Sequence, residues 1–467
     1  MQSAFDVLPL PKALLQVVES LGHQQMTPIQ AASIPLLLQG RDLVGQSQTG
    51  SGKTLAFALP LLAQVSLERR TPQALVLCPT RELSAQVARE LRKLGRSQPG
   101  LQVLVLAGGE PVRAQAHALE RGVHMVVGTP GRVIDHLERG TLELRHVGCV
   151  VLDEADRMLD MGFADAVEQI LGELPDARQT VFFSATFPST IEALSKRYQR
   201  APERVVIAAD ESSALAIEEQ VFVLEPGEKP AALRGTLAQH PHESALVFAN
   251  MKASVAEVEQ ALRGAGVSVA SIHGDLEQFE RDAVLAKFRN GSVRVLIATD
   301  VAARGIDVES LDLVVNYDLP AKPEVYVHRI GRTGRAGKQG AAVSFASERE
   351  KPKLKAIEAL IKRPLARVRF DPSARAALPE PAQELAREAK MTTLKIAGGR
   401  KQKVRPGDIL GALTGEAGGL PGSDIGKIEI HDNFSYVAVA AAVSRAALKS
   451  LSTGRIKGKR FVVTLVK

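Results

Sequence analysis

The chain has 467 residues, of which 45% are hydrophobic and 24% are charged, and its formal net charge is +7. This length suggests about three domains, and the composition is that of an ordinary soluble globular protein that can bury large cores. The sequence contains no stretch of about 18 apolar residues free of charge, which excludes a transmembrane helix.

The first ten residues lack both a basic start and a long apolar run, which argues against a secretory leader. We therefore expect a cytoplasmic monomer without a membrane partner. The two cysteines, Cys78 and Cys149, lie inside apolar runs and are too far apart for a zinc pattern. Buried, reduced thiols are the simplest interpretation, and a disulfide is the alternative.

The first chemical motif in the chain spans residues 47–54 and lies between a short apolar run and a helix-like segment, residues 55–65. Glycines at two of its positions allow main-chain N–H groups to converge on a phosphate, and the helix dipole adds positive charge. Lys53 is placed to reach the β and γ phosphates, and Thr54 to hold Mg²⁺. A plain loop is the alternative, since the strict pattern has glycine where this chain has Ser47. The candidate phosphate-binding residues are Ser47, Gln48, Thr49, Gly50, Ser51, Gly52, Lys53 and Thr54.

Short runs rich in Val, Leu and Ile alternate with helical patterns up to about residue 207. The runs after the first motif are residues 74–78, 103–107, 125–127, 149–152, 180–183 and 205–207. Continuous apolar runs separated by helices predict strands buried on both faces, and hence a parallel α/β sheet. Ligands of such sheets bind at the carboxyl ends of the strands. We place this first domain at residues 1–209.

The sequence Asp153-Glu154-Ala155-Asp156 directly follows one of these runs. An acidic residue at the end of a buried strand is costly unless it meets a cation, so Asp153 is the expected partner of Thr54 in holding Mg²⁺. Glu154 is then suited to orient and deprotonate the attacking water. An acidic helix cap is the alternative.

Ser184-Ala185-Thr186 follows the next apolar run. The hydroxyl groups of Ser184 and Thr186 can bond the carboxylate of Asp156 and so transmit the state of the nucleotide. Ordinary capping of a helix by these hydroxyl groups is the alternative.

With these motifs the sequence resembles the DEAD-box family of ATP-dependent RNA helicases over nearly its whole length. Residues 22–30, Gly-His-Gln-Gln-Met-Thr-Pro-Ile-Gln, resemble the Q motif with which that family reads adenine. The resemblance places Gln30 at the adenine edge and Phe5 against the base, and it accepts a small residue at Ser47. It implies ATP and Mg²⁺ as cofactors and ATP hydrolysis stimulated by RNA.

Three further segments have residue types that suit a sugar-phosphate track: Arg for charge, Thr hydroxyl groups for phosphate oxygens, and Gly for close approach. By resemblance they are RNA-backbone motifs, and loop punctuation is the alternative for the two that contain glycine. No base-reading group is evident, so we expect the core to bind RNA regardless of its sequence. The candidates are Pro79, Thr80, Arg81, Gly108, Gly109, Thr129, Pro130, Gly131 and Arg132.

Residues 210–219 are polar and lack a buried strand, so we expect an interdomain linker there and a second α/β domain at residues 218–369. The apolar runs of this domain are residues 245–248, 267–272, 293–298, 311–315 and 341–345. By resemblance, the two domains are tandem RecA-like parallel-sheet domains.

The second domain contains three arginines within seven residues, spaced by glycine, in His328 to Arg335. A solvated basic loop is one interpretation and an arginine finger for the ATP site is the other. The resemblance favours Arg332 and Arg335 as arginine fingers, and it places Asp307 on the ribose.

The other candidates in this domain are Arg281, Thr299 and Arg304, which the resemblance places on the RNA path or the domain interface. Phe279 stands where relatives often carry a polar residue. The family resemblance also implies that ATP and RNA together close the two domains on one strand, which is bent so that a duplex melts locally, and that hydrolysis releases it.

The excess positive charge lies at the C-terminal end of the chain. Residues 392–467 hold thirteen Lys or Arg against five Asp or Glu, whereas residues 1–391 hold 46 against 47. A polyanionic partner for this segment is the direct inference, and a merely soluble basic domain is the alternative. The preceding residues 370–391 have the composition of a linker.

Residues 392–467 have the strand and helix order of an RRM-like α+β domain. Phe434 and Tyr436 occupy two aromatic positions of the RNP1 pattern, but Val439 replaces the third and Lys395 stands where RNP2 would offer another aromatic residue. The two aromatics either stack on RNA or belong to the core. Binding is therefore expected to depend on Arg400, Lys401, Lys403, Arg405, Lys457, Lys459 and Arg460.

This C-terminal segment resembles the RNA-binding domain of DbpA-type helicases, in residues 405–415, 424–428 and 456–459. That resemblance implies 23S ribosomal RNA and large-subunit assembly intermediates as partners. An ATP-gated RNA clamp or chaperone without significant unwinding is the second hypothesis, and a DNA-acting helicase is a third that the Q motif disfavours.

Overall fold

The computed structural model describes residues 4–47, 50–207, 217–240, 242–303, 311–334, 339–369, 388–415 and 418–466. These residues form two compact units, the first containing the described residues up to 207 and the second those from 217 onward. Among the described residues, no helix combines the length and the apolarity needed to cross a membrane. Cys78 and Cys149 are buried free thiols, as predicted.

The first unit is built on a sheet in which every pair of neighbouring strands is parallel. The order across the sheet is β3-β4-β2-β5-β6-β1-β7. This arrangement confirms the parallel sheet predicted from the continuous apolar runs. The strands are β1 (Leu43–Gln46), β2 (Ala74–Leu77), β3 (Val103–Leu106), β4 (Met125–Gly128), β5 (Cys149–Leu152), β6 (Gln179–Ser184) and β7 (Glu203–Val206).

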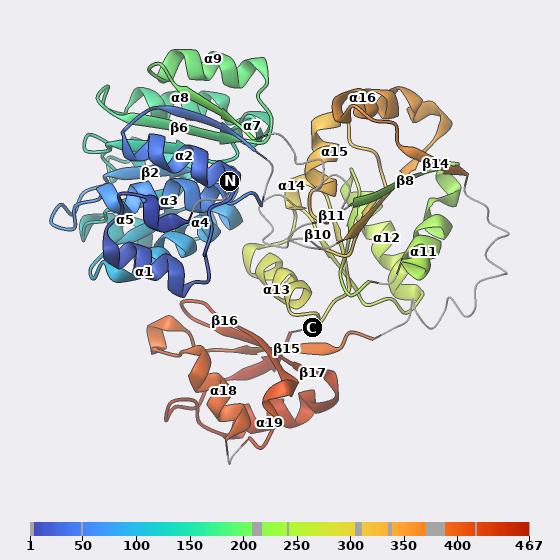
Figure 1. Ribbon diagram of the computed structural model, residues 1–467. Coiled ribbons are helices and arrows are strands. Elements are labelled where there is room, and N and C mark those ends of the chain that lie inside the picture. Colours follow the sequence, from blue (N-terminus) through green and yellow to red (C-terminus); the bar gives the residue numbers. More distant parts are fainter. Residues whose placement is uncertain are drawn as a thin grey trace. The chain divides into compact units, whose positions relative to one another are not determined.

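Both faces of this sheet are buried, because successive residues of one strand enter different apolar clusters. Val76 of β2 packs in the cluster that contains Phe57, whereas Leu75 packs in the cluster that contains Ile170. Helices accordingly lie on both sides of the sheet (Figure 1). They are α1 (Lys12–Ser20), α2 (Pro28–Leu38), α3 (Lys53–Gln64), α4 (Arg81–Leu94), α5 (Val112–Glu120), α6 (Pro130–Glu138), α7 (Ala155–Asp160), α8 (Ala164–Gly172) and α9 (Ser189–Tyr198).

The second unit contains another parallel sheet, with the strand order β10-β11-β9-β12-β13-β8-β14. Its strands are β8 (Ile217–Val223), β9 (Ala245–Phe248), β10 (Val269–Ile272), β11 (Val295–Ala298), β12 (Leu313–Asn316), β13 (Gly340–Ala346) and β14 (Ala366–Arg369). Its helices are α11 (Lys229–Gln239), α12 (Lys252–Gly264), α13 (Gln278–Arg289), α14 (Asp300–Ala303), α15 (Pro323–Ile330) and α16 (Lys351–Ile361).

Strand β8 was not predicted from the sequence. It begins at Ile217, inside the polar span that we assigned to the linker, so the end of that span belongs to the sheet. Its sequence, Ile-Glu-Glu-Gln-Val-Phe-Val, interleaves polar residues because only part of the strand is buried. A search for continuous apolar runs therefore misses it.

The second unit also contains a small antiparallel sheet with the order β16-β17-β15-β18. Along the chain, its elements follow the predicted order of strand, helix, strand, strand, helix, strand. An apolar cluster fills the space between the sheet and its two helices. The elements are β15 (Met391–Ile396), α18 (Pro406–Thr414), β16 (Ile425–Ile430), β17 (Ser435–Ala440), α19 (Ser444–Thr453) and β18 (Val463–Leu465).

Candidate nucleotide and RNA sites

Residues 50–54 form the turn that enters α3. Gly50 and Gly52 have positive φ values of 82° and 90°, and Gly52 is the N-cap of α3. Glycine adopts this left-handed conformation without a steric penalty. The first N–H groups of α3 have no acceptor within the helix, so the turn can bind an anion. Gln48 and Thr49, which the sequence places in the same site, lie outside the described residues.

Lys53 is the buried cation of this turn. Its Nζ donates a hydrogen bond to the main-chain oxygen of Ser47 at 2.7 Å, and the hydroxyl oxygens of Ser47 and Ser51 lie 2.8 Å apart. Burial lowers the pKa of Lys53, and the carboxylates of Asp153 and Glu154 oppose that shift. The ammonium group is therefore held just beyond the carboxyl end of β1, within the field of the acidic residues.

Asp153 lies buried at the carboxyl end of β5. Its main-chain N–H donates to the main-chain oxygen of Leu77 at 2.9 Å. This bond ties the backbone of Asp153 to the end of the neighbouring strand β2. Burial and the negative charge of Glu154 raise the pKa of Asp153 to about 7, while Lys53 opposes the rise. A carboxyl group in this environment gains from a bound cation.

The oxygen donors beside the turn suit Mg²⁺. Thr54 begins α3 beside Lys53, and Asp153 supplies a carboxylate. In the described part of the chain, no group of three or more His, Cys, Asp or Glu side chains could hold a metal ion. Because Mg²⁺ commonly uses one or two protein oxygens together with water and substrate phosphate, the donor set fits an ion that arrives with a nucleotide.

Glu154 has an unusual backbone for a residue with a side chain. Its φ of 53° and ψ of 50° place it in the left-handed region, where it is the N-cap of α7. Such a conformation costs about 1–3 kcal/mol and persists only where the surrounding structure enforces it. Its buried carboxylate lies 3.5 Å from Nε of Arg157, which is itself buried. The turn therefore holds Glu154 in one fixed position beside Asp153.

Asp156 connects α7 to the end of β6. Its Oδ2 accepts hydrogen bonds from both the N–H and the hydroxyl group of Thr186, at 2.9 Å and 2.7 Å. The expected contact of the Thr186 hydroxyl is thus present. Ser184 meets Asp156 at the main chain, because its hydroxyl oxygen accepts from the N–H of Asp156 at 3.3 Å, whereas the expectation placed this hydroxyl on the carboxylate.

Gln30 connects α2 to the phosphate turn. Its amide nitrogen donates to the oxygen of Gly52 at 3.1 Å, and its amide oxygen accepts from the N–H of Thr27 at 2.9 Å. The Thr27 hydroxyl donates to the oxygen of Ser51 at 2.7 Å. The two Gln30 bonds use one of its two N–H groups and one oxygen lone pair. Phe5, expected against the base, is buried in the apolar cluster of the first unit.

The three candidate RNA segments of the first unit follow neighbouring strands. Strands β3, β4 and β2 are adjacent, and residues 108–109, 129–132 and 79–83 lie just beyond their carboxyl ends. A Cβ atom on Gly108 would lie 2.7 Å from the guanidinium group of Arg81, so these two segments touch. The sheet therefore brings the RNA candidates of this unit to one edge.

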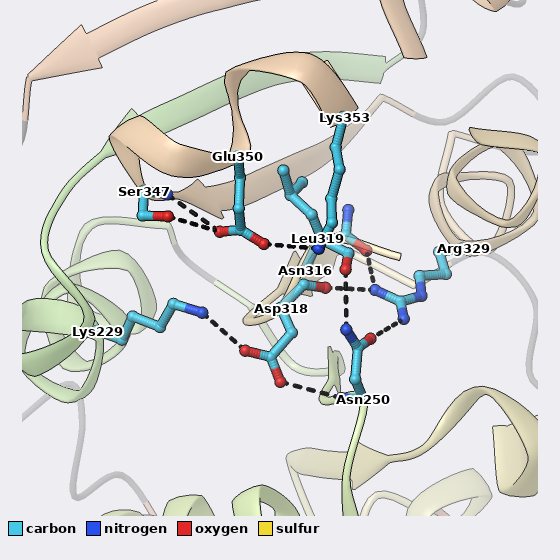
Figure 2. Close-up of polar contacts among 9 residues, drawn as sticks. All are labelled: Lys229, Asn250, Asn316, Asp318, Leu319, Arg329, Ser347, Glu350 and Lys353. Carbon is cyan, nitrogen blue, oxygen red and sulfur yellow. Dashed lines mark hydrogen bonds and ion pairs between the residues drawn. The ribbon is translucent and has the colours of Figure 1, made fainter. Parts of the chain in front are cut away.

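In the second unit, Arg329 ties together the ends of three strands. It is 1% exposed and donates to both carboxylate oxygens of Asp300, at 2.6 Å and 2.7 Å. It also donates to the side-chain oxygens of Asn316 and Asn250, at 3.1 Å and 2.9 Å. Figure 2 shows these two amides and Asp318 gathered around the guanidinium group. Arg329 therefore orders this edge of the sheet from within.

Two other predicted residues of this unit converge on α14. The hydroxyl group of Thr299 accepts a hydrogen bond from the N–H of Ala302 at 3.4 Å. Arg281 donates to the oxygen of Ala302 at 3.3 Å. Arg332 is buried at the end of α15, and its main-chain oxygen accepts from the N–H of Leu311 at 3.0 Å. Arg304, Asp307 and Arg335 lie outside the described residues.

The aromatic residues of the small sheet lie on the face opposite its apolar core. Tyr436 is 1% exposed and pairs across the sheet with Lys395 and Glu429, whereas its neighbour Val437 enters the core cluster. Phe434 is half-buried, and Lys395 Nζ lies 4.9 Å from the centre of its ring. Within this unit, Arg289 of α13 donates to both carboxylate oxygens of Glu429. Tyr436 is therefore buried, although it lies outside the apolar cluster.

The predicted basic residues of the small domain are all exposed and lie in two adjoining loops, which we call the basic loop surface. It consists of two loops joined by a hydrogen bond from Lys457 Nζ to the main-chain oxygen of Lys403 at 2.8 Å. Exposed cations on two adjoining loops are suited to a phosphate backbone. Its members are Arg400, Lys401, Lys403, Arg405, Lys457, Lys459 and Arg460.

Three family models match the chain. A DEAD/DEAH box helicase model matches residues 27–194, a helicase conserved C-terminal domain model residues 228–337, and a DbpA RNA binding domain model residues 393–465. Over 470 aligned residues the chain is 48% identical to the ATP-dependent RNA helicase DbpA of Escherichia coli, covering 100% of both proteins. The chain belongs to the DEAD-box family of RNA helicases.

As a DEAD-box helicase of the DbpA type, the protein is an ATP hydrolase with two RecA-like parallel-sheet domains. The DEAD-box helicase CshA of Bacillus cereus is 45% identical over 366 residues, which cover 78% of this chain and 70% of that protein. A solved structure of Saccharomyces cerevisiae Dbp5 bound to RNA and ADP BeF3 is 32% identical, with a TM-score of 0.72 over 82% of this chain and 100% of that chain.

Several residues that organise the sites of this DEAD-box helicase were not singled out from the sequence. Arg157 meets Glu154 three residues away in the chain, and that acid-to-base spacing was the available signal. Arg329 stands in the same arginine-rich segment as Arg332, and the hydrogen bonds of its guanidinium group to Asp300, Asn250 and Asn316 mark it as an organising residue. Its partner Asn250 lies two residues after the buried strand β9, and Asn316 ends the buried strand β12, which was the signal for them.

Proposed function

We propose that this DEAD-box helicase couples RNA-stimulated ATP hydrolysis to local separation of RNA strands, and that its small domain delivers it to 23S ribosomal RNA during assembly of the large subunit. The observation that carries the catalytic part is the buried group of Lys53, Asp153 and Glu154 at one edge of the first sheet. The targeting part is supported by the full-length similarity to DbpA, which includes the small domain.

In the proposed reaction, bound ATP supplies the γ-phosphate that is transferred to water. Lys53 exchanges its bond to Ser47 for one to a phosphate oxygen. Thr54 and Asp153 would hold Mg²⁺ through their side-chain oxygen atoms, and the bound ion would supply positive charge against the phosphate oxygens. Glu154 orients the attacking water and accepts its proton, and the fixed left-handed turn keeps its carboxylate in place.

The remaining nucleotide roles follow the family pattern. Gln30 selects adenine with its second amide N–H group and its second oxygen lone pair, which are not used by Gly52 and Thr27. Phe5 contributes an aromatic surface for the base. Asp307 contacts the ribose. Arg332 and Arg335 stabilise the charge that develops on the transferred phosphoryl group.

RNA binding is proposed at the three loop segments of the first unit and at Arg281, Thr299 and Arg304. The backbone-binding residue types there predict binding without sequence preference. Preference is assigned instead to the basic loop surface. Asp156, Ser184 and Thr186 are proposed to couple nucleotide state to RNA, because Asp156 lies two residues after Glu154 and is hydrogen-bonded to Thr186, which lies two residues beyond the end of β6.

The test is ATP hydrolysis at limiting RNA, measured with a 23S ribosomal hairpin fragment, a generic RNA of equal length, and DNA. The full chain is compared with a Lys401→Gln/Lys459→Gln variant of the basic loop surface and with a matched control, Lys196→Gln/Lys351→Gln, at exposed lysines elsewhere.

We expect the wild type and the control to prefer the ribosomal fragment, and the basic-loop variant to lose that preference while keeping its rate on excess generic RNA. Equal stimulation by both RNAs in the wild type contradicts the targeting. Hydrolysis without displacement of a short paired strand instead supports an ATP-gated clamp.

A further inference from the structure

Gln115 of α5 lies at the centre of a buried polar cluster between two of the candidate RNA segments. It is 2% exposed. Its amide nitrogen donates to the main-chain oxygens of Ala107 and Val105, at 3.0 Å and 3.4 Å. Its amide oxygen accepts from Nη1 of Arg132 at 2.7 Å and lies 3.0 Å from Nε2 of His136. All four hydrogen-bonding positions of the amide are thus used.

The partners of Gln115 determine how its amide is oriented. Two carbonyl oxygens require the NH₂ group, and a guanidinium group can only donate, so the amide oxygen must face α6. Nε2 of buried His136 must then carry hydrogen, and its Nδ1 lies 2.8 Å from the hydroxyl oxygen of Thr141, which donates to the main-chain oxygen of His136 at 3.1 Å. Burial, and the positive charge of Arg132, lower the pKa of His136 and favour its neutral form. The orientation of the Gln115 amide is therefore determined by its partners.

Arg132 is tied in turn to the glycine segment. The same Nη1 donates to the main-chain oxygen of Glu110 at 3.0 Å, and Nε lies 3.6 Å from the carboxylate of Asp135. The side chain remains 15% exposed. Gln115 therefore holds the strand end at Ala107 with one end of its amide and Arg132 with the other.

We infer that Gln115 is a positioning residue for RNA binding, which fixes the guanidinium group of Arg132 and the Gly108-Gly109 segment relative to each other. The inference rests on the proposed RNA contact of Arg132. A long arginine side chain loses rotamer freedom when it binds, and a guanidinium group already held in place loses less. Removing Gln115 should weaken RNA binding although it does not contact RNA.

The main test replaces Gln115 by Met, which has a similar length and no hydrogen-bonding amide. We expect the RNA concentration that half-saturates ATP hydrolysis to rise about tenfold, as for loss of one hydrogen bond to a charged group, with little change in the rate at saturating RNA or in ATP affinity. Gln115→Asn is the second variant. The amide of asparagine is too short to reach both Ala107 and Arg132, so this variant should show the same rise in the half-saturating RNA concentration. It provides the test if the Met variant does not fold.

The matched control is Gln199→Met. Gln199 is also buried, and its amide also donates to two main-chain oxygens, those of Leu43 and Thr180, while its oxygen accepts from the hydroxyl group of Ser195. Within the described residues, these side-chain hydrogen bonds of Gln199 do not involve the RNA segments. A purely structural effect of losing a buried amide should lower the melting temperature of both variants but leave the half-saturating RNA concentration of the control unchanged.

A double mutant separates this inference from the proposed role of Arg132. Arg132→Ala alone should raise the half-saturating RNA concentration, and adding Gln115→Met should raise it by a smaller factor than Gln115→Met does in the wild type, because part of the effect of Gln115 acts through Arg132. If Arg132→Ala has no effect, the proposed RNA contact is wrong. If Arg132→Ala weakens RNA binding but both Gln115 variants bind RNA as tightly as the wild type, the positioning role is wrong.

Discussion

Thr186 donates two hydrogen bonds to one carboxylate oxygen of Asp156, from its N–H at 2.9 Å and from its hydroxyl group at 2.7 Å. The pair joins α7, which begins next to Glu154, to the segment that follows β6. Because the acceptor is charged, each bond is stronger than one between neutral groups. The two hydrogen bonds therefore join these two segments, as the proposed coupling role requires.

Thr186→Val removes the hydroxyl bond and keeps the side-chain shape. We expect ATP affinity to stay within about twofold of the wild type, while strand displacement per ATP hydrolysed falls about tenfold, the effect of one charge-assisted hydrogen bond. The control is Thr180→Val, near the start of β6, the strand that precedes Thr186. If the two variants displaced equal amounts of strand per ATP hydrolysed, Thr186 would have no specific part in the coupling.

Lys53→Ala removes the buried cation of the phosphate turn. We expect ATP affinity to fall at least about tenfold, because a charge-assisted contact to phosphate contributes about 1.5–3 kcal/mol. Titration with a fluorescent ATP analogue measures the affinity directly. An unchanged affinity would show that the turn around Gly52 does not bind phosphate.

His136 gives a pH-dependent contribution to stability. Its pKa lies below the ordinary 6.5 because burial and Arg132 disfavour the charged form, even though Asp135 opposes the shift. The unfolded chain therefore binds a proton that the folded protein does not, and the free energy of unfolding decreases as the pH falls below about 6.5, by at most about 1.4 kcal/mol per pH unit.

Melting temperatures at pH 5.5, 6.5 and 7.5 test this contribution. Between pH 6.5 and pH 5.5, the melting temperature of the wild type should fall more than that of His136→Gln. Above pH 7, the melting temperatures of the two proteins should change with pH in parallel. The control, His117→Gln, changes an exposed histidine of α5 and should follow the wild type. Parallel curves for the wild type and His136→Gln would contradict the sign of the pKa shift.

Arg329→Met leaves the carboxylate of Asp300 without its buried partner. Breaking such a pair costs about 3–5 kcal/mol, so we expect the second unit to unfold at a clearly lower urea concentration. The control is Arg367→Met. The Arg367 side chain is 43% exposed, so its ion pair with Glu358 should contribute less than about 1 kcal/mol to stability. Similar losses in the two variants would mean that the Arg329 network is not a main support of this unit.

The sequence allowed the parallel sheets to be predicted because their strands are continuous apolar runs, such as Cys149–Leu152. It also allowed the glycine-containing turn before α3 and the acidic pair after β5 to be located, since each is contiguous in the chain. Strand β8 was missed because its polar residues interrupt the apolar run. The same limitation applies to any strand that is buried only in part.

Contacts between distant residues could not be predicted in this way. Gln115, Arg132 and His136 lie within 21 residues in the chain, but only packing of α5 against β3 and α6 brings them together. Whether the Ser184 hydroxyl meets the main chain or the carboxylate of Asp156 is set by the backbone path around β5 and β6, and the structure shows the main-chain contact. Such details depend on tertiary geometry, which a residue pattern does not encode.

The most direct test of the account is ATP hydrolysis by Glu154→Gln, with and without RNA, combined with ATP-dependent RNA binding. The substitution keeps the size of the side chain and removes the proposed base. We predict that turnover is abolished while ATP-dependent RNA binding is retained, because nucleotide and RNA still bind. Turnover at the wild-type rate would contradict the account, since the carboxylate beside Asp153 would then have no part in the reaction.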